Sequence, residues 1–212
     1  MEPLDDTLWF PEPNADEIVA IGGDLSIERL LLAYRSGIFP WSASPITWWS
    51  PDPRAIFELN QFHIPARLAK TLRTGRFTFT RDRAFRKVIT ACAERPRDES
   101  TWIEPEFISA YTKLHEAGHA HSVECWRDGQ LAGGIYGVST GGLFAGESMF
   151  HCAPDAGKAA LCHLADHLKQ RGHQLFDIQM LTPITKQFGA TEIPREEYLK
   201  RLAKALEVEC EF

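Results

Sequence analysis

The sequence lacks the features that would place a protein in a membrane or on the secretory route. Its 212 residues contain no apolar run of about 18 residues, the length that a membrane-spanning helix needs. The start of the chain does not combine basic residues with an apolar core, as a signal peptide would. We also find no internal repeat and no low-complexity tract. We therefore expect a cytoplasmic protein without a membrane segment.

Cysteine is scarce and follows no recognisable pattern. The five cysteines are odd in number and form no CxxC motif, so we expect reduced thiols rather than a disulfide framework or a zinc knuckle. His119 and His121 would share one face of a strand, and a metal site there would need His115 or Cys125 as a third ligand. No third ligand has a convincing spacing. We expect no metal and interpret the two histidines as polar residues at the edge of a strand.

Positive charge is concentrated in one segment of an acidic chain whose net charge is −6. Residues 1–60 hold ten acidic and three basic residues, residues 61–97 hold two and ten, and residues 98–212 hold seventeen and ten. A compact basic block suits a polyanion, because Lys and Arg release counterions from phosphates. Arg67, Lys70 and Arg73 recur every three residues there, which makes a basic ridge on a helix. The alternative is a solvated helical face that happens to be basic.

The spacing of apolar residues predicts a mixed fold. Residues 123–151 alternate apolar positions around turns at Asp128-Gly129 and at 139–142, which predicts three antiparallel strands, and a further strand is expected at 174–181. Helices are predicted at 26–36, 63–75, 82–94, 105–118, 154–172, 182–189 and from residue 194 onward, with a polar loop at 94–105. The expected fold class is α+β with a mostly antiparallel central sheet.

Two carboxylates lie within apolar stretches of these strands. Glu147 lies in LFAGESMF and Asp177 in LFDIQML, where an ionisable side chain is costly unless it is paired or employed. In a continuous strand Gln179 would share the face of Asp177. Strand glycines such as Gly133 and Gly146 mark a bulge or a close approach of another group. Together these residues suggest a site, and the alternative is that buried polar residues merely bond each other.

The first 60 residues are rich in proline and tryptophan, including Trp41, Trp48 and Trp49. Prolines fix an irregular path, and tryptophan side chains supply the large apolar area that can pin it. The tryptophans either staple a small core or form an aromatic surface on which a base stacks. The residues alone leave both interpretations open.

Seven short motifs occur in order along the chain. They are AIGGDLS at 20–26, GIFPW at 37–41, WWSPDPR at 48–54, TWI at 101–103, LHEAGHAHSVE at 114–124, GGIYGV with GESMF at 133–150, and GATEIPREEYL at 189–199. In this combination the chain resembles the bacterial leucyl/phenylalanyl-tRNA protein transferase family over essentially its whole length. The resemblance implies a small N-terminal domain, expected at 1–62, followed at 63–212 by a catalytic domain with the GNAT (acyl-CoA N-acyltransferase) fold.

The resemblance also implies an activity. The chain would be an aminoacyltransferase that moves Leu or Phe from Leu-tRNA or Phe-tRNA to the N-terminal Arg or Lys of a protein or peptide, marking it for degradation under the N-end rule. Asp177, Gln179 and Glu147 would lie at the reacting centre. Asp177 would polarise Gln179 and orient the incoming amine, and Glu147 would pair with the positive side chain of the acceptor.

Further residues are assigned by the same resemblance. Ile135, Phe144, Met149 and Phe176 would line the pocket for the Leu or Phe side chain, although by sequence alone they are simply core residues of strands. Trp49 and Trp102 would lie near the adenosine end of the tRNA, and Arg67, Lys70 and Arg73 would contact its phosphates. We expect a monomer without a cofactor or metal, since the ester of aminoacyl-tRNA is already activated.

Two other functions stay open at this stage. A non-catalytic tRNA-binding or RNA-binding protein would use the same basic block and aromatic residues. An acetyltransferase of the same fold would bind acyl-CoA. The phosphate-cradling Q/RxxGxG loop of acyl-CoA-using relatives does not follow GESMF in this sequence, which disfavours an acyl-CoA donor.

Overall fold

The computed structural model of the chain describes residues 2–4, 7–13, 17–94 and 102–212. Its elements are β1 (Glu2–Leu4), β2 (Ile18–Gly22), α1 (Ile27–Arg35), β3 (Phe39–Ala43), β4 (Ile46–Trp49), β5 (Arg54–Phe57), the 3₁₀ turn η1 (Leu59–Gln61), α2 (Ala66–Arg73), β6 (Thr78–Arg81), α3 (Phe85–Ala93), α4 (Pro105–Glu116), β7 (Ala120–Arg127), β8 (Gln130–Thr140), β9 (Leu143–His151), α5 (Ala156–Arg171), β10 (Leu175–Asp177), α6 (Pro183–Lys186), β11 (Thr191–Ile193) and α7 (Arg195–Leu206). Most of the predicted loop at 94–105 lies outside the described residues. None of the helices described here is long and apolar enough to cross a membrane.

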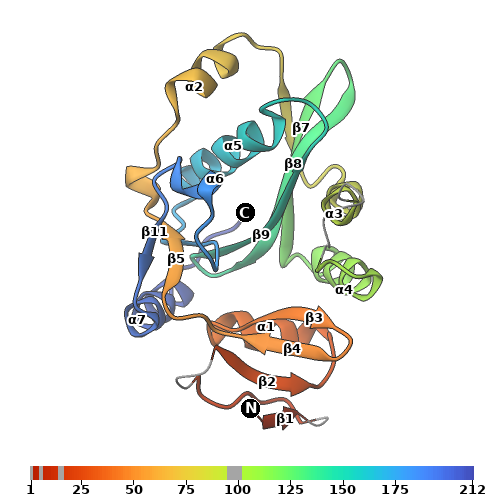
Figure 1. The fold of residues 1–212 in the computed structure, drawn as a ribbon, viewed down its shortest axis with the longest axis vertical. Coiled ribbons are helices and arrows are strands. Elements are labelled where there is room, and N and C mark those ends of the chain that lie inside the picture. The colour runs from red at the N-terminus through yellow and green to blue at the C-terminus, as the bar shows by residue number, and fades with distance from the viewer. Residues whose placement is uncertain (1, 5–6, 14–16, 95–101) are drawn as a thin grey trace.

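Two sheets organise the described part of the chain (Figure 1). The smaller has the strand order β1-β2-β4-β3, and the larger has the order β11-β5-β10-β9-β8-β7-β6. In the larger sheet only β9 and β10 pair in parallel, and every other pair is antiparallel. The expected α+β class and the three hairpin-linked strands β7, β8 and β9 are confirmed.

Helices cover both faces of the larger sheet. α5 packs on one face of β7, β8 and β9, and α3 and α4 pack on the other (Figure 1). A Cβ at Gly133 would lie 2.7 Å from backbone atoms of Ala156 and Gly157, so only glycine lets α5 approach β8 this closely. The close approach that the strand glycines predict is therefore confirmed at this position.

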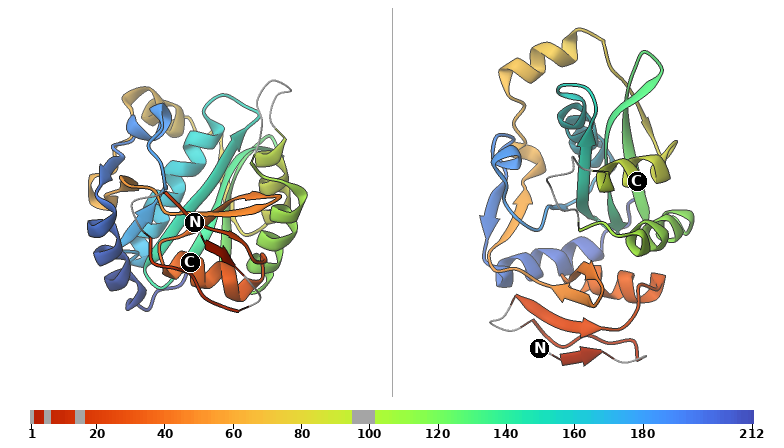
Figure 2. Two further views of the ribbon diagram at one scale, coloured as in Figure 1. Left: turned by 60° about the horizontal axis from the view of Figure 1, so that its bottom comes forward. Right: turned by 45° about the vertical axis from the view of Figure 1, so that its right-hand side comes forward.

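The small sheet and α1 lie at one end of the molecule and α2 at the other (Figures 1 and 2). Trp48 and Leu30 share a continuous hydrophobic core with Phe107 and Tyr111 of α4. β5 falls within residues 1–62 but belongs to the larger sheet. The domain boundary expected after residue 62 therefore does not coincide with the boundary between the sheets, and the division into two domains stays a prediction.

Several helix boundaries follow directly from local sequence. The Ser26 side chain accepts a hydrogen bond from the Arg29 backbone N–H and caps α1, which begins at the start of the helix predicted at 26–36. α4 begins at Pro105, whose missing N–H costs nothing in the first turn. Strands β1 to β6 and β11 were not predicted from the sequence, and the irregular path expected for residues 1–60 is wrong where β1 to β5 form. Each of these strands is only three to five residues long, so the sequence pattern within it is weak.

Candidate functional site

The turn after β10 differs from the predicted strand at 174–181. β10 ends at Asp177, and Gln179 adopts a left-handed backbone conformation with φ of 56°. The Gln179 backbone N–H donates to Asp177 Oδ1 at 2.9 Å, which closes a turn of the kind that aspartate side chains favour. The expectation that Asp177 and Gln179 share one strand face is therefore wrong, since the strand stops between them.

The Asp177 carboxylate is fully engaged inside the protein. Arg54 Nε donates to Asp177 Oδ1 at 2.9 Å and Arg54 Nη2 donates to Oδ2 at 2.7 Å. The Tyr198 hydroxyl also donates to Oδ2, at 2.9 Å. Burial lowers the pKa of Arg54, but the charge of Asp177, its hydrogen bonds and the nearby Tyr198 and Glu147 together outweigh burial, and the net shift is upward. Neither Arg54 nor Tyr198 was predicted as a site residue, because their roles depend on contacts with Asp177, 123 and 21 positions away.

The backbone of β5 holds the same turn. Ile178 N–H donates to the Ala55 carbonyl at 3.0 Å, and Ala55 N–H donates to the Gln179 carbonyl at 3.1 Å. Gln179 is 7% exposed, so its side chain has little freedom beyond the direction that the turn gives it. That direction brings Gln179 Nε2 to 3.2 Å from Glu147 Oε1, to which it donates a hydrogen bond.

Glu147 lies at an irregularity of β9. Tyr136 of β8 pairs with Ser148 and Gly137 pairs with Gly146, so Glu147 is the extra residue of a β-bulge. A bulge bends a strand and redirects a side chain, and bulges are frequent beside functional sites. This confirms the expectation that glycines in these strands mark a bulge.

A buried pair of tyrosines supports Glu147. Tyr34 of α1 donates its hydroxyl to Glu147 Oε1 at 2.8 Å. The Tyr34 and Tyr111 hydroxyl oxygens lie 2.5 Å apart, and both side chains are buried. Burial raises the pKa of both phenols well above the ordinary value, so they are neutral hydrogen-bond donors at neutral pH.

Burial also raises the pKa of Glu147, to about 8. The charge of Asp177 adds to the increase, and the hydrogen bond from Tyr34 opposes it. A carboxyl group with a pKa near neutrality, inside a pocket, changes its protonation state with little cost, which is a property of groups that handle charge or protons.

The pocket that Glu147 faces has a volume of about 600 Å³. Its walls are formed by Phe39, Pro40, Trp41, Ser42, Trp102, Glu104, Glu147, Ile178, Gln179, Met180 and Thr182. Asp177 is not among them. The Trp41 and Trp102 rings stack with centroids 6.4 Å apart, and Trp41 also contacts Trp49 at 5.8 Å. Trp41 therefore contacts both Trp49 and Trp102, the two tryptophans that the resemblance places near the adenosine end of the tRNA.

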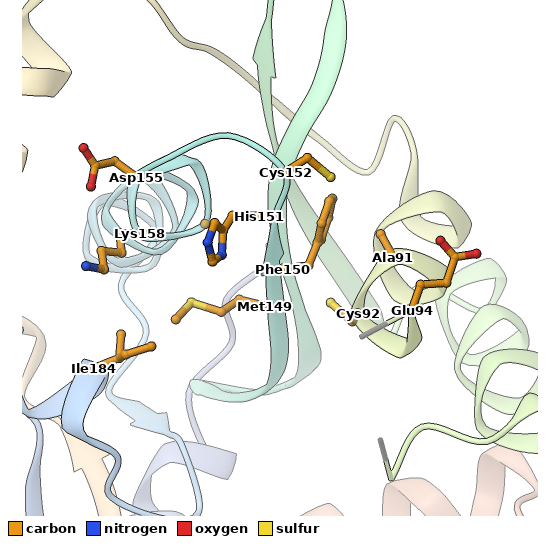
Figure 3. Close-up of a pocket in the computed structure, with 11 residues that line it drawn as sticks. Ala91, Cys92, Glu94, Met149, Phe150, His151, Cys152, Asp155, Lys158 and Ile184 are labelled. Atoms are coloured by element: carbon orange, nitrogen blue, oxygen red, sulfur yellow. The ribbon is translucent and has the colours of Figure 1, made fainter. Parts of the chain in front are cut away.

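A second pocket, of about 670 Å³, lies at the C-terminal end of β9 (Figure 3). Met149 and His151 point toward α5 and α6, and Phe150 points toward α3 (Figure 3). Ile135, Phe144 and Phe176 are buried in the same hydrophobic cluster against which Met149 packs. The structure therefore brings the four residues expected around the donor side chain together, and Met149 is the one of the four that lines this second pocket.

The three basic residues of the predicted ridge lie on α2. Arg67, Lys70 and Arg73 are exposed, and the described residues provide no acidic partner for any of them.

One of the two histidines considered as metal ligands has a carboxylate partner instead: His121 Nδ1 lies 2.8 Å from Asp82 Oδ2. Within the described ranges, no group of three His, Cys, Asp or Glu side chains could hold a metal ion.

Two models of one protein family match the sequence of this chain. The family model described as leucyl/phenylalanyl-tRNA protein transferase matches residues 56–203, and the model of the N-terminal domain of that family matches residues 23–52. The chain belongs to the leucyl/phenylalanyl-tRNA protein transferase family. It is an enzyme of the aminoacyltransferase class, as the sequence motifs predict.

Curated relatives of this transferase agree over nearly their whole length. A leucyl/phenylalanyl-tRNA–protein transferase from Anaeromyxobacter sp. (strain Fw109-5) is 51% identical over 205 residues, which are 93% of this chain and 87% of the relative. One from Syntrophotalea carbinolica is 50% identical over 209 residues, 95% of this chain and 91% of the relative.

Among solved structures, L-PGS from Bacillus licheniformis aligns with 78% of this transferase and 54% of its own chain, at a TM-score of 0.45 and 16% identity. A GCN5-related N-acetyltransferase from Kribbella flavida aligns with 76% of this transferase and 59% of its own chain, at a TM-score of 0.42 and 11% identity.

Proposed function

We propose that this aminoacyltransferase moves leucine or phenylalanine from Leu-tRNA or Phe-tRNA to the N-terminal Arg or Lys of a protein in the cytoplasm, marking that protein for degradation. The observation that carries the proposal is Glu147, a carboxyl group held between Tyr34 and Gln179 at the wall of a pocket to which the described part of the chain contributes no basic side chain. A cation that binds beside Glu147 favours the ionised carboxylate and pairs with it, so the pocket favours a positively charged acceptor over a neutral one.

The reaction is attack of the acceptor α-amine on the aminoacyl ester. A C–N bond forms, the C–O bond to the ribose breaks, and the proton of the amine ends on the released ribose hydroxyl. Gln179 and Glu147 face the reacting amine in this scheme. Gln179 is too weakly basic to take the proton, so its role is to orient the amine, and the proton passes through water or the ribose hydroxyl.

Asp177 acts through Gln179 in this proposal rather than by contact with the amine. Both of its oxygens already accept hydrogen bonds, from Arg54, Tyr198 and the Gln179 backbone. The carboxylate therefore serves as a positioning residue that fixes the turn, and through the turn the direction of the Gln179 side chain. Its loss would misplace Gln179 without removing any group that touches substrate.

The donor side chain needs an apolar space that accepts both a branched aliphatic chain and an aromatic ring. We assign this role to Ile135, Phe144, Met149 and Phe176. Met149 supports the assignment because it is partly exposed at a pocket and methionine adapts its shape to different neighbours. Trp49 and Trp102 would stack near the terminal adenosine of the tRNA.

The tRNA itself would bind along α2. Arg67, Lys70 and Arg73 are exposed there in the most basic segment of the chain, and phosphates are the groups that such a ridge attracts. We propose that the enzyme acts as a monomer. It needs neither metal nor cofactor, since the aminoacyl ester of the donor tRNA is already activated.

The test is transfer of labelled phenylalanine from Phe-tRNA to a peptide with N-terminal Arg, with acetyl-CoA offered in a parallel reaction. The proposal predicts a labelled peptide in the first reaction and no acetylated peptide in the second. Binding of Phe-tRNA without transfer would identify a tRNA-binding protein instead. Acetylation without aminoacyl transfer would identify an acetyltransferase.

A further inference from the structure

A second group of exposed basic residues lies at the start of α3. Residues 67–87 contain eight basic residues and one acidic residue. Three of the eight form the ridge on α2, and four others lie at the end of β6 and the beginning of α3. These four are exposed and are called the β6–α3 basic surface below: Arg81, Arg83, Arg86 and Lys87.

The positive charges at the start of α3 are unfavourable for the helix itself. Arg86 and Lys87 are its second and third residues, and its first turn contains no acidic residue. Arg83 directly precedes the N-cap residue Ala84. The N-terminus of a helix carries a partial positive charge, so cations at this end reduce the stability of the helix. Stability therefore does not explain why basic residues occupy these positions, whereas binding of an anion does.

Two carboxylates fix the backbone that carries these side chains. Glu124 of β7 is fully buried and accepts hydrogen bonds from the backbone N–H of Arg83 at 3.4 Å and from that of Ala84 at 3.3 Å. Asp82 has a left-handed backbone conformation with φ of 56°, and its Oδ1 accepts a hydrogen bond from the Ser122 N–H at 2.8 Å. The turn into α3 is therefore anchored to β7, and the basic side chains project from a fixed backbone.

The positive charges of the β6–α3 basic surface are not neutralised by the described part of the chain. The ion pairs of the described residues include none with Arg83, Arg86 or Lys87. Arg81 Nη1 donates to His163 Nε2 at 3.2 Å. Burial and the charge of Arg81 lower the pKa of His163, so this imidazole is neutral at neutral pH and does not offset the arginine charge.

The β6–α3 basic surface is near the pocket assigned to the donor side chain. β6 is the edge strand of the larger sheet and joins the chain from α2 to α3, two helices that lie well apart (Figures 1 and 2). In the last turn of α3, Ala91 and Cys92 line the pocket at the C-terminal end of β9 (Figure 3). The nine residues of α3 span about 13 Å, so its basic first turn lies on the order of 10 Å from that pocket.

We propose that the β6–α3 basic surface binds phosphates of the donor tRNA that lie away from its aminoacylated end. The inference rests on the proposed function for its ligand, because the tRNA is the donor of that reaction. Lys and Arg gain affinity for phosphates by releasing counterions, and the α2 ridge, earlier in the same segment, is assigned to the same polyanion. Because α2 and α3 lie apart, the two groups of basic residues contact different phosphates and contribute separately to affinity.

The experiment compares two donors for a triple variant in which Arg83, Arg86 and Lys87 are replaced by alanine. One donor is full-length Phe-tRNA, and the other is a short RNA with only the last few nucleotides of the tRNA and phenylalanine on its 3′ end. Affinity for each is measured across a salt series. For Phe-tRNA we expect affinity at low salt to fall about tenfold or more, and the slope of log K against log salt to decrease by about 2 to 3 units. Affinity for the short donor and turnover at saturating Phe-tRNA should stay near wild type.

The matched control removes the same charge elsewhere. Lys169, Lys200 and Lys204 are exposed on α5 and α7, and their triple alanine variant should keep the wild-type slope. Arg86→Lys should also keep it, since a phosphate contact of this kind depends on charge rather than on side-chain shape. The α3 triple variant removes cations from a helix N-terminus, so urea unfolding should show it to be at least as stable as wild type.

A wild-type slope in the α3 triple variant overturns the inference. An equal loss of affinity for the short donor also overturns it, because the surface would then face the aminoacylated end. A raised KM for the acceptor peptide with unchanged tRNA affinity overturns it as well, in favour of an acidic protein partner. The predicted loss of slope without any transfer by wild type would overturn the proposed function alone, and absence of Phe-tRNA binding by wild type would overturn both.

Discussion

Arg54 and Asp177 form a bidentate ion pair in which both side chains are 1% exposed. The pair joins β5 to the end of β10. Arg54 Nη1 also donates to the Gly37 carbonyl at 3.0 Å, so the guanidinium links the segment after α1 to the turn that carries Gln179. A buried pair of this kind is weak evidence for stability, but removing one partner leaves the other charge uncompensated.

Asp177→Asn should therefore affect both folding and catalysis. Loss of the carboxylate leaves the Arg54 guanidinium buried without a counter-charge, and we expect the free energy of unfolding to fall by about 3–5 kcal/mol. In the protein that remains folded, turnover should fall about 100-fold, because the turn no longer fixes Gln179, while affinity for Phe-tRNA is kept. Urea unfolding, single-turnover transfer and donor binding measure the three quantities.

Tyr198→Phe separates positioning from the cost of an unpaired charge. It removes one hydrogen bond to Asp177 but keeps the ion pair, so the free energy of unfolding should fall by only about 1 kcal/mol. Turnover should fall several-fold, and the exposed control Asp128→Asn should change neither quantity. Activity of folded Asp177→Asn within threefold of wild type would remove Asp177 from the mechanism.

The raised pKa of Glu147 predicts how stability depends on pH. The folded protein holds this proton up to a pH of about 8, whereas the unfolded chain releases it near the ordinary value of 4.5. The group therefore stabilises the fold fully below about pH 4.5, and this stabilisation is lost as the pH rises toward 8. Glu147→Gln, which stays neutral, should gain stability relative to wild type across that window, by on the order of a few kcal/mol.

Urea unfolding of wild type and Glu147→Gln at pH 5, 7 and 9 measures that difference. The free energy of the variant minus that of wild type should increase with pH, and Glu106→Gln should show a much flatter dependence, since Glu106 is exposed. A constant difference between pH 5 and pH 9 would show that Glu147 is not held protonated by its surroundings.

The basic ridge of α2 predicts a defined dependence on salt. Alanine at Arg67, Lys70 or Arg73 should weaken binding of any tRNA by a similar factor and lower the slope of log K against log salt by about 0.7 to 0.9 per phosphate contact. Turnover at saturating donor should stay near wild type. Lys169→Ala and Lys204→Ala, exposed on α5 and α7, serve as controls. A triple α2 variant with the wild-type slope would mean that tRNA docks elsewhere.

The apolar pocket predicts a change in donor choice. Met149 is partly exposed at a pocket, and truncation to alanine enlarges the space, so transfer from Phe-tRNA should rise relative to transfer from Leu-tRNA. Phe176 is fully buried, with its ring 5.2 Å from Phe57 and 5.7 Å from Phe144, and Phe176→Ala should cost about 3–5 kcal/mol of stability. An unchanged Phe-to-Leu ratio in Met149→Ala would place the donor side chain away from this residue.

Local signals made much of the fold predictable. The alternation in β7, β8 and β9 and the Asp128-Gly129 turn define three strands within one stretch of sequence. Ser26 and Pro105 mark helix starts through the chemistry of the first turn. In each case the partners that decide the structure are neighbours in the chain, so a single sequence contains the information.

The site was only partly predictable, because its decisive contacts are distant in sequence. Glu147 and Asp177 stood out as carboxylates in apolar strands, but Arg54, in a proline-rich segment, resembled an ordinary surface arginine. Its burial depends on a partner 123 positions away. The left-handed backbone of Gln179 could not be predicted either. The apolar residues around Gln179 continue the strand pattern, but the hydrogen bond from the Gln179 N–H to the Asp177 side chain ends the strand.

In the proposed reaction the α-amine of an N-terminal Arg attacks an aminoacyl ester. The most direct measurement is a single-turnover reaction of the enzyme with Phe-tRNA and two peptides of one sequence, one with a free N-terminal Arg and one with that amine acetylated, followed by mass spectrometry. We expect a product one phenylalanyl residue heavier from the free peptide only, with the new residue preceding Arg. Equal modification of both peptides, or modification of neither, would contradict it.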